Sequence, residues 1–170
     1  MSHITKHIQT PSDIQAHRTL LKEQGKTLVT TNGCFDILHV GHLRYLQASR
    51  ELGDFLWIAI NSDASVQRLK GPSRPIIPEN ERLELLAGLS CVDAVTLFDE
   101  DTPEDLLVSM APDIHVKGGQ YTVETLPEAP ALQAVGTDLQ FIDMVEGRST
   151  SNVIQRILDV YTPNTPAITS

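Results

Sequence analysis

The stretch that decides the fold is TLVTTNGCFDILHVGHLRYLQASRELGDFLWIAIN, residues 27–61. Its first seven residues, 27–33, are rich in β-branched side chains and end in a glycine, as a buried strand does. Apolar residues three or four apart then predict a helix from about Val40 to Leu52, and FLWIAIN (55–61) predicts a second strand. Because a crossover of this length forces the two strands to run parallel, the stretch predicts a β-α-β unit.

The same alternation of strands and helices continues on both sides of this unit. A capping-box pattern at Ser12 predicts a helix that ends near Gly25. The later elements predicted by spacing are a helix at 79–90, a strand at 94–97, a helix opened by Thr102-Pro103, strands at 113–116 and 139–142, and a closing helix at about 153–158. This order is typical of an α/β fold and predicts a single Rossmann-like, doubly wound, mostly parallel sheet.

The chain has 170 residues, which is the size of one globular domain. We expect an N-terminal helical segment at 1–26 packed on a domain at 27–160, followed by a flexible tail at 161–170 that is rich in Pro, Thr and Ser. Ligands of such a sheet bind at the carboxyl ends of its strands. Three polar clusters fall at predicted strand ends, at 31–42, 117–121 and 147–152.

Charge and composition exclude several kinds of partner. The formal net charge of −9 offers no broad cationic field for a nucleic acid, so an anionic ligand must be captured locally. The opening residues lack the apolar core of a signal peptide, and the apolar run at 55–60 is too short to span a bilayer. Cys34 and Cys91 are too few for a disulfide framework. We therefore expect a cytoplasmic protein that binds neither nucleic acid nor membrane.

The first polar cluster combines a helix start with two histidines. Gly41 falls in the first turn of the predicted helix, where free backbone N–H groups and the helix dipole attract an anion. His39 and His42 are three residues apart, so both imidazoles lie on one face and can donate hydrogen bonds to the same anion. Two alternatives stay open: the histidines are structural, or they join Cys34 as three zinc ligands.

The other two clusters also have structural alternatives. Lys117 stands at a strand end beside Gly118, either as a solvated lysine before a turn or as a cation that reaches a bound anion. Ser149, Thr150 and Ser151 precede the last helix, where such residues commonly serve as N-caps. Asp36 and Asp63 follow strands and are solvated or turn-forming carboxylates, or contacts to substrate hydroxyls or to an outer metal water.

Taken together, the motifs resemble those of the cytidylyltransferase-like nucleotidyltransferase superfamily, and most closely the adenylyltransferase part of bacterial ADP-heptose synthase. The segments that carry the resemblance, in order, are GCFDILHVGH (33–42), NSD (61–63), RLKG (68–71) with Arg74-Pro75, Glu81-Arg82, VKGGQY (116–121) and GRSTSN (147–152). An ordered series over about residues 12–160 is far more specific than the HxGH pattern alone.

The resemblance implies transfer of AMP from ATP to D-glycero-β-D-manno-heptose 1-phosphate, which gives ADP-heptose for lipopolysaccharide core assembly and releases pyrophosphate. It also implies Mg²⁺ held by the phosphates rather than directly by protein ligands, and membership of carbohydrate metabolism. The resemblance implies a stand-alone transferase, so we expect a separate kinase to supply the sugar phosphate. A homodimer is expected from relatives alone.

The resemblance also assigns roles to individual residues. The implied catalytic residues are His39, His42 and Lys117. The implied nucleotide-binding residues are Gly33, Cys34, Phe35, Gly41, Arg82, Gly118, Ser149, Thr150 and Ser151. The implied substrate-binding residues are Asp36, Asn61, Asp63 and Lys70. Gln120 departs from the family pattern, which has aspartate there, and this leaves the exact sugar open.

Two other functions stay open from the sequence. A cytidylyltransferase acting on glycerol 3-phosphate or a related alcohol phosphate shares the HxGH and Ser/Thr motifs. A non-catalytic nucleotide-binding sensor is possible on the same fold, because a fold does not determine activity. Pyrophosphate release with ATP or CTP separates the three.

Overall fold

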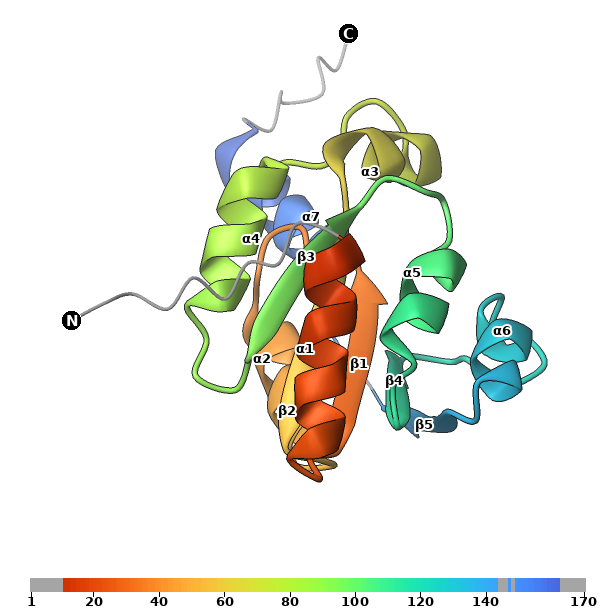
Figure 1. Cartoon of the computed structure of the whole chain (residues 1–170). Helices are drawn as coiled ribbons and strands as arrows, with labels where there is room; N and C mark the ends of the chain where they lie inside the picture. Colours follow the sequence, from red (N-terminus) through yellow and green to blue (C-terminus); the bar gives the residue numbers. More distant parts are fainter. Residues whose placement is uncertain (1–10, 144–146, 148, 163–170) are drawn as a thin grey trace, which may run out of the picture.

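The computed structural model describes residues 11–143, 147 and 149–162. Five parallel strands form one sheet in the order β3-β2-β1-β4-β5 (Figure 1). The elements in chain order are α1 (Pro11–Glu23), β1 (Leu28–Gly33), α2 (Val40–Arg50), β2 (Phe55–Asn61), α3 (Asp63–Lys70), α4 (Glu79–Ala87), β3 (Ala94–Phe98), α5 (Glu104–Met110), β4 (Ile114–Gly118), α6 (Ala129–Ala134), β5 (Asp138–Ile142) and α7 (Thr150–Tyr161). The predicted parallel α/β fold is confirmed.

The strand order creates a switch point beside β1. The chain builds outward from β1 through β2 to β3, and then returns to the other side of β1 with β4 and β5. The register pairs Leu28 with Phe55 on one side, and Val29 with Ile114 on the other. Crossovers therefore leave β1 and β4 in opposite directions, and ligands of open α/β sheets bind in the crevice at such a point.

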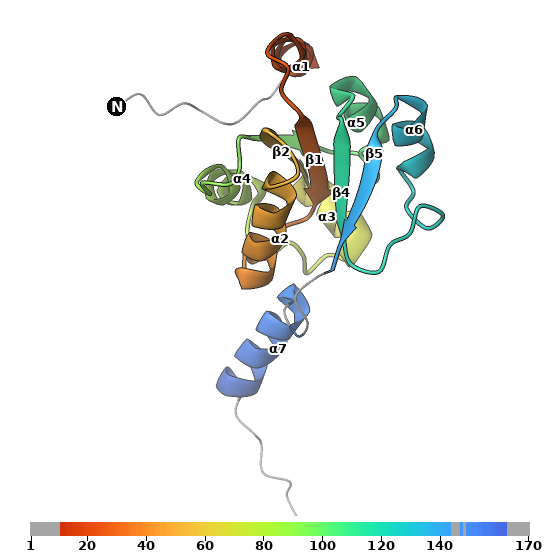
Figure 2. The same ribbon diagram turned by 90° about the horizontal axis from the view of Figure 1, so that it is seen from below.

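Helices cover both faces of the sheet, with α1, α5 and α6 on one side and α2 and α4 on the other (Figure 2). Alternating side chains of the strands feed two cores. Leu28 and Trp57 pack with α1, α5 and α6, whereas the neighbouring Val29 and Leu56 pack on the opposite face. β1 and β2 are therefore buried on both faces along most of their length.

The structure differs from the sequence prediction at two helix boundaries and has two additional helices. The first helix begins at Pro11, so Ser12 lies inside its first turn rather than before it. The helix predicted at 79–90 ends at Ala87. Two helices were not expected: α3 has only eight residues with a largely polar sequence, and α6 has only six. Helices this short carry too few apolar positions to show a clear 3.6-residue period.

The closing helix α7 begins where the Ser/Thr cluster predicts. Ser149 is its N-cap, and the Ser149 hydroxyl accepts a hydrogen bond from the Asn152 N–H at 3.1 Å. The rest of α7 projects away from the sheet, and none of its described side chains is buried (Figure 2). Residues 1–10, Arg148 and most of the predicted tail, 163–170, lie outside the described residues.

Within the ranges that the structure describes, no helix has both the length and the apolar character needed to cross a bilayer.

Candidate active site

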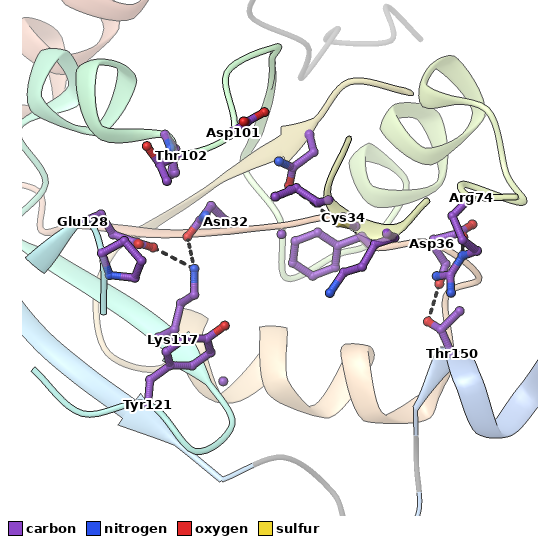
Figure 3. A pocket seen from close by; sticks show the side chains of 18 of the residues that line it. Asn32, Cys34, Asp36, Arg74, Asp101, Thr102, Lys117, Tyr121, Glu128 and Thr150 are labelled. Atoms are coloured by element: carbon purple, nitrogen blue, oxygen red, sulfur yellow. Dashed lines mark hydrogen bonds and ion pairs between the residues drawn. The ribbon is translucent and has the colours of Figure 1, made fainter. Parts of the chain in front are cut away.

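A cavity of about 550 Å³ opens at the carboxyl ends of the strands, across the switch point (Figure 3). Its walls come from the ends of β1, β2 and β4, from the segments after β3 and β4, and from the start of α7. The lining residues are Asn32, Gly33, Cys34, Phe35, Asp36, His42, Asn61, Leu69, Lys70, Arg74, Asp101, Thr102, Pro103, Lys117, Gly118, Tyr121, Pro127, Glu128, Thr150 and Ser151. The three polar clusters of the sequence therefore meet in one place.

The turn between β1 and α2 forms one wall of this cavity. Phe35 has φ +48° and Ile37 has φ +53°, a left-handed backbone conformation that residues other than glycine rarely adopt. Such a backbone costs on the order of 1–3 kcal/mol per residue and persists only where surrounding contacts hold it. The strain lies at the position where the sequence predicts a ligand.

Asp36 supplies the contacts that hold this turn. Its buried carboxylate accepts hydrogen bonds from the Ile76 and Ile77 N–H groups and from Arg74 Nε at 2.6 Å. The Asp36 carbonyl accepts a hydrogen bond from the Thr150 hydroxyl. Burial opposes ionisation, but these donors outweigh it and lower the pKa of Asp36. Asp36 therefore ties residues 74–77 and the start of α7 to the turn.

His39 and His42 stack on each other at the start of α2. Their ring centroids are 3.9 Å apart and their planes differ by 23°. His39 is the N-cap of the helix, and its Nδ1 accepts a hydrogen bond from the Gly41 N–H at 3.1 Å. That bond places the proton of the neutral ring on Nε2, which makes Nε2 a donor. The prediction that the two imidazoles share one face is confirmed.

The His42 ring is neutral near pH 7. Burial, and then the charge of His39, lower its pKa to about 4. The ring lines the cavity, lies 5.4 Å from the Phe35 ring, and its buried Nδ1 has no hydrogen-bond partner among the described residues. A neutral imidazole still donates one hydrogen bond, so this histidine can bind an anion without carrying charge itself.

Two expectations for this wall need correction. The Gly41 N–H is not one of the open donors of the helix start, because it is already bonded to His39. The zinc alternative is contradicted: no three His, Cys, Asp or Glu side chains of the described chain lie together as metal ligands would. Burial also raises the pKa of the Cys34 thiol, which opposes the thiolate form that zinc requires.

The opposite wall is built around Lys117 at the end of β4. The Lys117 ammonium contacts Glu128 Oε1 at 2.7 Å and donates to Asn32 Oδ1 at 2.8 Å (Figure 3). It also lies 5.5 Å from the centroid of the Tyr121 ring. Burial opposes ionisation of Glu128, but the neighbouring His115 ring and the Lys117 ammonium lower its pKa to about 2. The wall therefore contains a fixed ion pair.

Arg82 and Asp63 take structural positions instead of lining the cavity. Arg82 is only 1% exposed, and its guanidinium donates to the carbonyls of Ile77, Cys34 and Asn61 and to the Asp63 carboxylate. These bonds join the ends of β1 and β2 to the segment before α4. Arg82 cannot reach a triphosphate in this conformation, so the predicted phosphate contact is not made. Its guanidinium instead holds Cys34 and Asn61, which line the cavity, in place.

The other predicted residues divide between the cavity and its supports. Lys70, the last residue of α3, lines the cavity, is exposed, and has no hydrogen-bond or ion-pair partner within the described chain. Arg74, part of the motif series, pairs with buried Asp36. Thr150 and Ser151 line the cavity, whereas Ser149 serves the helix cap. Lys70 is therefore an exposed cation at the cavity, without a hydrogen-bond or ion-pair partner among the described residues.

Sequence reasoning missed Asn32, Glu128 and Tyr121 as cavity residues. Asn32 and Tyr121 stand within or beside motifs that were recognised. Glu128 gave no signal of its own, because it lies eleven residues beyond Lys117 in an irregular segment before a six-residue helix.

With this geometry in place, the chain can be compared with known proteins. The family model described as cytidylyltransferase-like matches residues 30–169. The chain belongs to this family. It is 57% identical over 140 residues to the bifunctional protein HldE of Syntrophotalea carbinolica, and 50% identical over 141 residues to that of Trichlorobacter lovleyi. These matches cover 82% and 83% of this chain, but only 29% of each relative.

Two solved structures show the same fold. A lipopolysaccharide core biosynthesis protein from Thermoplasma volcanium GSS1 is 32% identical with a TM-score of 0.59, covering 71% of this chain and 98% of that protein. A pantoate-beta-alanine ligase from Francisella tularensis, complexed with beta-gamma ATP and beta-alanine, has a TM-score of 0.56 over 90% of this chain and 78% of its own. At 12% identity it supports the fold alone.

Proposed function

We propose that the chain is a nucleotidyltransferase that transfers AMP from ATP to D-glycero-β-D-manno-heptose 1-phosphate, forming ADP-heptose and pyrophosphate. The observation that carries the proposal is that His42, whose ring stacks on that of His39, lines the same cavity as the cation of Lys117. The heptose and adenine assignments rest on the resemblance of the motifs, and are supported by identity with the HldE proteins.

The chemistry needs no covalent intermediate. An oxygen of the sugar 1-phosphate is already an anionic nucleophile, and it attacks the α-phosphorus of ATP. The bond from that phosphorus to the bridging oxygen breaks, and pyrophosphate departs with its electron pair. The protein must hold the two phosphates in line and stabilise charge on the equatorial and departing oxygens.

The cavity residues suit that task. His42 offers a neutral hydrogen-bond donor at the start of α2, beside the His39 ring, where the helix dipole also favours an anion. Lys117 offers a charged donor on the other wall, and Lys70 offers an exposed cation. Thr150 and Ser151 place hydroxyls and the first turn of α7 beside the same cavity. Donors fixed before the reaction stabilise developing charge without reorganising.

The described residues fit a Mg²⁺ ion that is carried by the nucleotide. The three carboxylates that line the cavity, Asp36, Asp101 and Glu128, are each paired with Arg or Lys. Mg²⁺ commonly keeps several waters and binds substrate phosphates, so it needs no protein cage here. When bound, it would neutralise charge on the phosphate oxygens.

The test is pyrophosphate release with ATP or CTP against a panel of sugar 1-phosphates and alcohol phosphates, with and without Mg²⁺. We expect turnover with ATP and heptose 1-phosphate in the presence of Mg²⁺. Preference for CTP with glycerol 3-phosphate would replace the proposal by a cytidylyltransferase. Nucleotide binding without pyrophosphate release from any pair would indicate a sensor. A homodimer stays a prediction.

A further inference from the structure

The Lys117 ammonium, near the end of β4, is paired with the carboxylate of Glu128, a residue outside the sequence motifs. Glu128 lies immediately before α6, and only 2% of its surface is exposed. Its Oε1 contacts the Lys117 ammonium at 2.7 Å. A buried carboxylate is costly unless it is paired, so Glu128 and Lys117 depend on each other.

A second acceptor completes the arrangement around Lys117. Asn32 Oδ1, at the end of β1, accepts from the same ammonium at 2.8 Å, and the Lys117 side chain is only 14% exposed. An ammonium has three N–H donors. Among the described residues, Glu128 and Asn32 fix two of them, so the third is left to point at an anion in the cavity.

His115 lies in the core next to the Glu128–Lys117 pair. It is 1% exposed, and its Nδ1 is 2.8 Å from the Thr30 hydroxyl. Its Nε2 stands 3.8 Å from Glu128 Oε1, beyond hydrogen-bond distance, and has no hydrogen-bond partner in the described chain. Burial lowers the pKa of His115, so the ring is neutral and leaves the Glu128 charge to Lys117.

We propose that Glu128 is a positioning residue for the transfer reaction, whose buried carboxylate holds the Lys117 ammonium in place against the cavity. This inference rests on the proposed function. A carboxylate has the wrong sign to bind phosphate itself, so Glu128 acts through Lys117. Its removal brings two opposite effects: the cavity becomes less negative toward ATP, and the ammonium loses its fixed geometry.

The experiment compares Glu128→Gln, Lys117→Met and the double variant in the pyrophosphate-release assay. In Glu128→Gln we expect kcat to fall by about tenfold or more, because a misplaced catalytic group loses rate steeply with distance. The KM for ATP stays unchanged or falls. In the Lys117→Met background, the Glu128 substitution changes kcat by less than about twofold, since the group through which it acts is absent.

Asp113→Asn is the matched control. Asp113 lies at the opposite end of the same strand, where its carboxylate pairs with Arg18 at 2.9 Å and accepts from the Leu28 N–H. We expect this variant to lose stability but keep kcat and KM. Glu128→Asp, which keeps the charge on a shorter side chain, is expected to fall between the wild type and Glu128→Gln in kcat.

Two kinetic outcomes would overturn the inference. One is a kcat for Glu128→Gln within twofold of the wild type. The other is an equal fold loss with and without Lys117, which would assign Glu128 to direct substrate contact or to folding.

NMR relaxation of the lysine ε-methylene groups tests the positioning role of Glu128 without any need for turnover. Absence of turnover in the wild type would count against the proposed function, not against this role. Lys117 should be rigid in the wild type and mobile in Glu128→Gln, with exposed Lys26 as the mobile reference. A Lys117 side chain as mobile as Lys26 in the wild type would refute the positioning role.

Discussion

The two walls of the cavity are built in different ways. The wall between β1 and α2 comes from one continuous segment, residues 33–42, whose histidines stack at the helix start. The opposite wall is assembled from Asn32, Lys117 and Glu128, which lie on separate elements. The first wall can be read from neighbouring residues in the chain, whereas the second exists only after folding has brought distant residues together.

The walls also differ in charge. His42 is neutral because burial and His39 lower its pKa to about 4, so the histidine wall acts through hydrogen bonds. The lysine wall carries full charges: Glu128 has a pKa of about 2 and its partner is an ammonium. We infer that the histidine wall stabilises charge formed during transfer, whereas the lysine wall orients phosphates that are already charged.

The largest expected effect comes from the histidine wall. His42→Ala should lower kcat by roughly a hundredfold or more, in the range seen when an oxyanion-binding donor is removed. Stability should change little, because the ring is only partly buried. Steady-state pyrophosphate release and a thermal melt measure both quantities. A kcat near that of the wild type would mean that this wall carries no transition-state charge.

A smaller effect is expected from the lysine wall. Lys117→Met should lower kcat/KM by about thirtyfold, the size of a lost hydrogen bond to a charged group.

Lys70→Met should act mainly on the KM for ATP, since Lys70 is exposed and unpaired within the described chain. Lys26→Met, beyond α1 and outside the cavity lining, is the control. Equal losses of kcat/KM in the Lys117 and Lys26 variants would show that a lysine in the cavity contributes no more than a lysine on the surface.

A third prediction concerns the support of the histidine wall. Asp36→Asn should lower the free energy of unfolding by about 1.5 kcal/mol, because Arg74 and two N–H groups lose their buried carboxylate. Asp101→Asn should change it by less than about 0.5 kcal/mol, since its pair with Arg68 is exposed. Urea unfolding of the two variants measures the difference. Equal midpoints would show that Asp36 does not hold the strained turn.

A further prediction concerns the pH dependence of stability. His42 has a folded pKa of about 4 and an ordinary value of 6.5, so below 6.5 the unfolded chain binds the proton more readily. Stability should therefore fall as pH decreases from 6.5 to 4, and His42→Gln should show a shallower slope over this window. Paired Glu128, with a pKa of about 2, loses its contribution only at lower pH. Parallel slopes in wild type and variant would contradict the neutral ring.

Physical signals that are local in the chain were sufficient for much of this molecule. The β-α-β unit, the N-cap at Ser149 and the shared face of His39 and His42 follow from period, capping chemistry and helix geometry. The assignment of Lys117 to the cavity depended on a motif at a strand end.

The remaining features depend on contacts between distant residues. Asp36 was predicted as a ligand residue, yet its carboxylate is used by the segment forty residues later. Arg82 was predicted to bind phosphate, yet three carbonyls and Asp63 occupy its guanidinium. Glu128 could not be found, because only the packing of α6 brings it to Lys117. Charged residues that pair only through tertiary contacts cannot be recognised from the spacing of residues in the sequence.

The most direct test of the central claim is the single-turnover rate of His39→Asn with ATP and the sugar phosphate identified by the panel. Asparagine is a good N-cap and can still accept the Gly41 N–H, so this variant removes the imidazole while keeping the cap. We predict a rate lower by about a hundredfold with ATP affinity within a few-fold of the wild type. A rate equal to that of the wild type would contradict the claim that the stacked imidazoles stabilise the transferring phosphate.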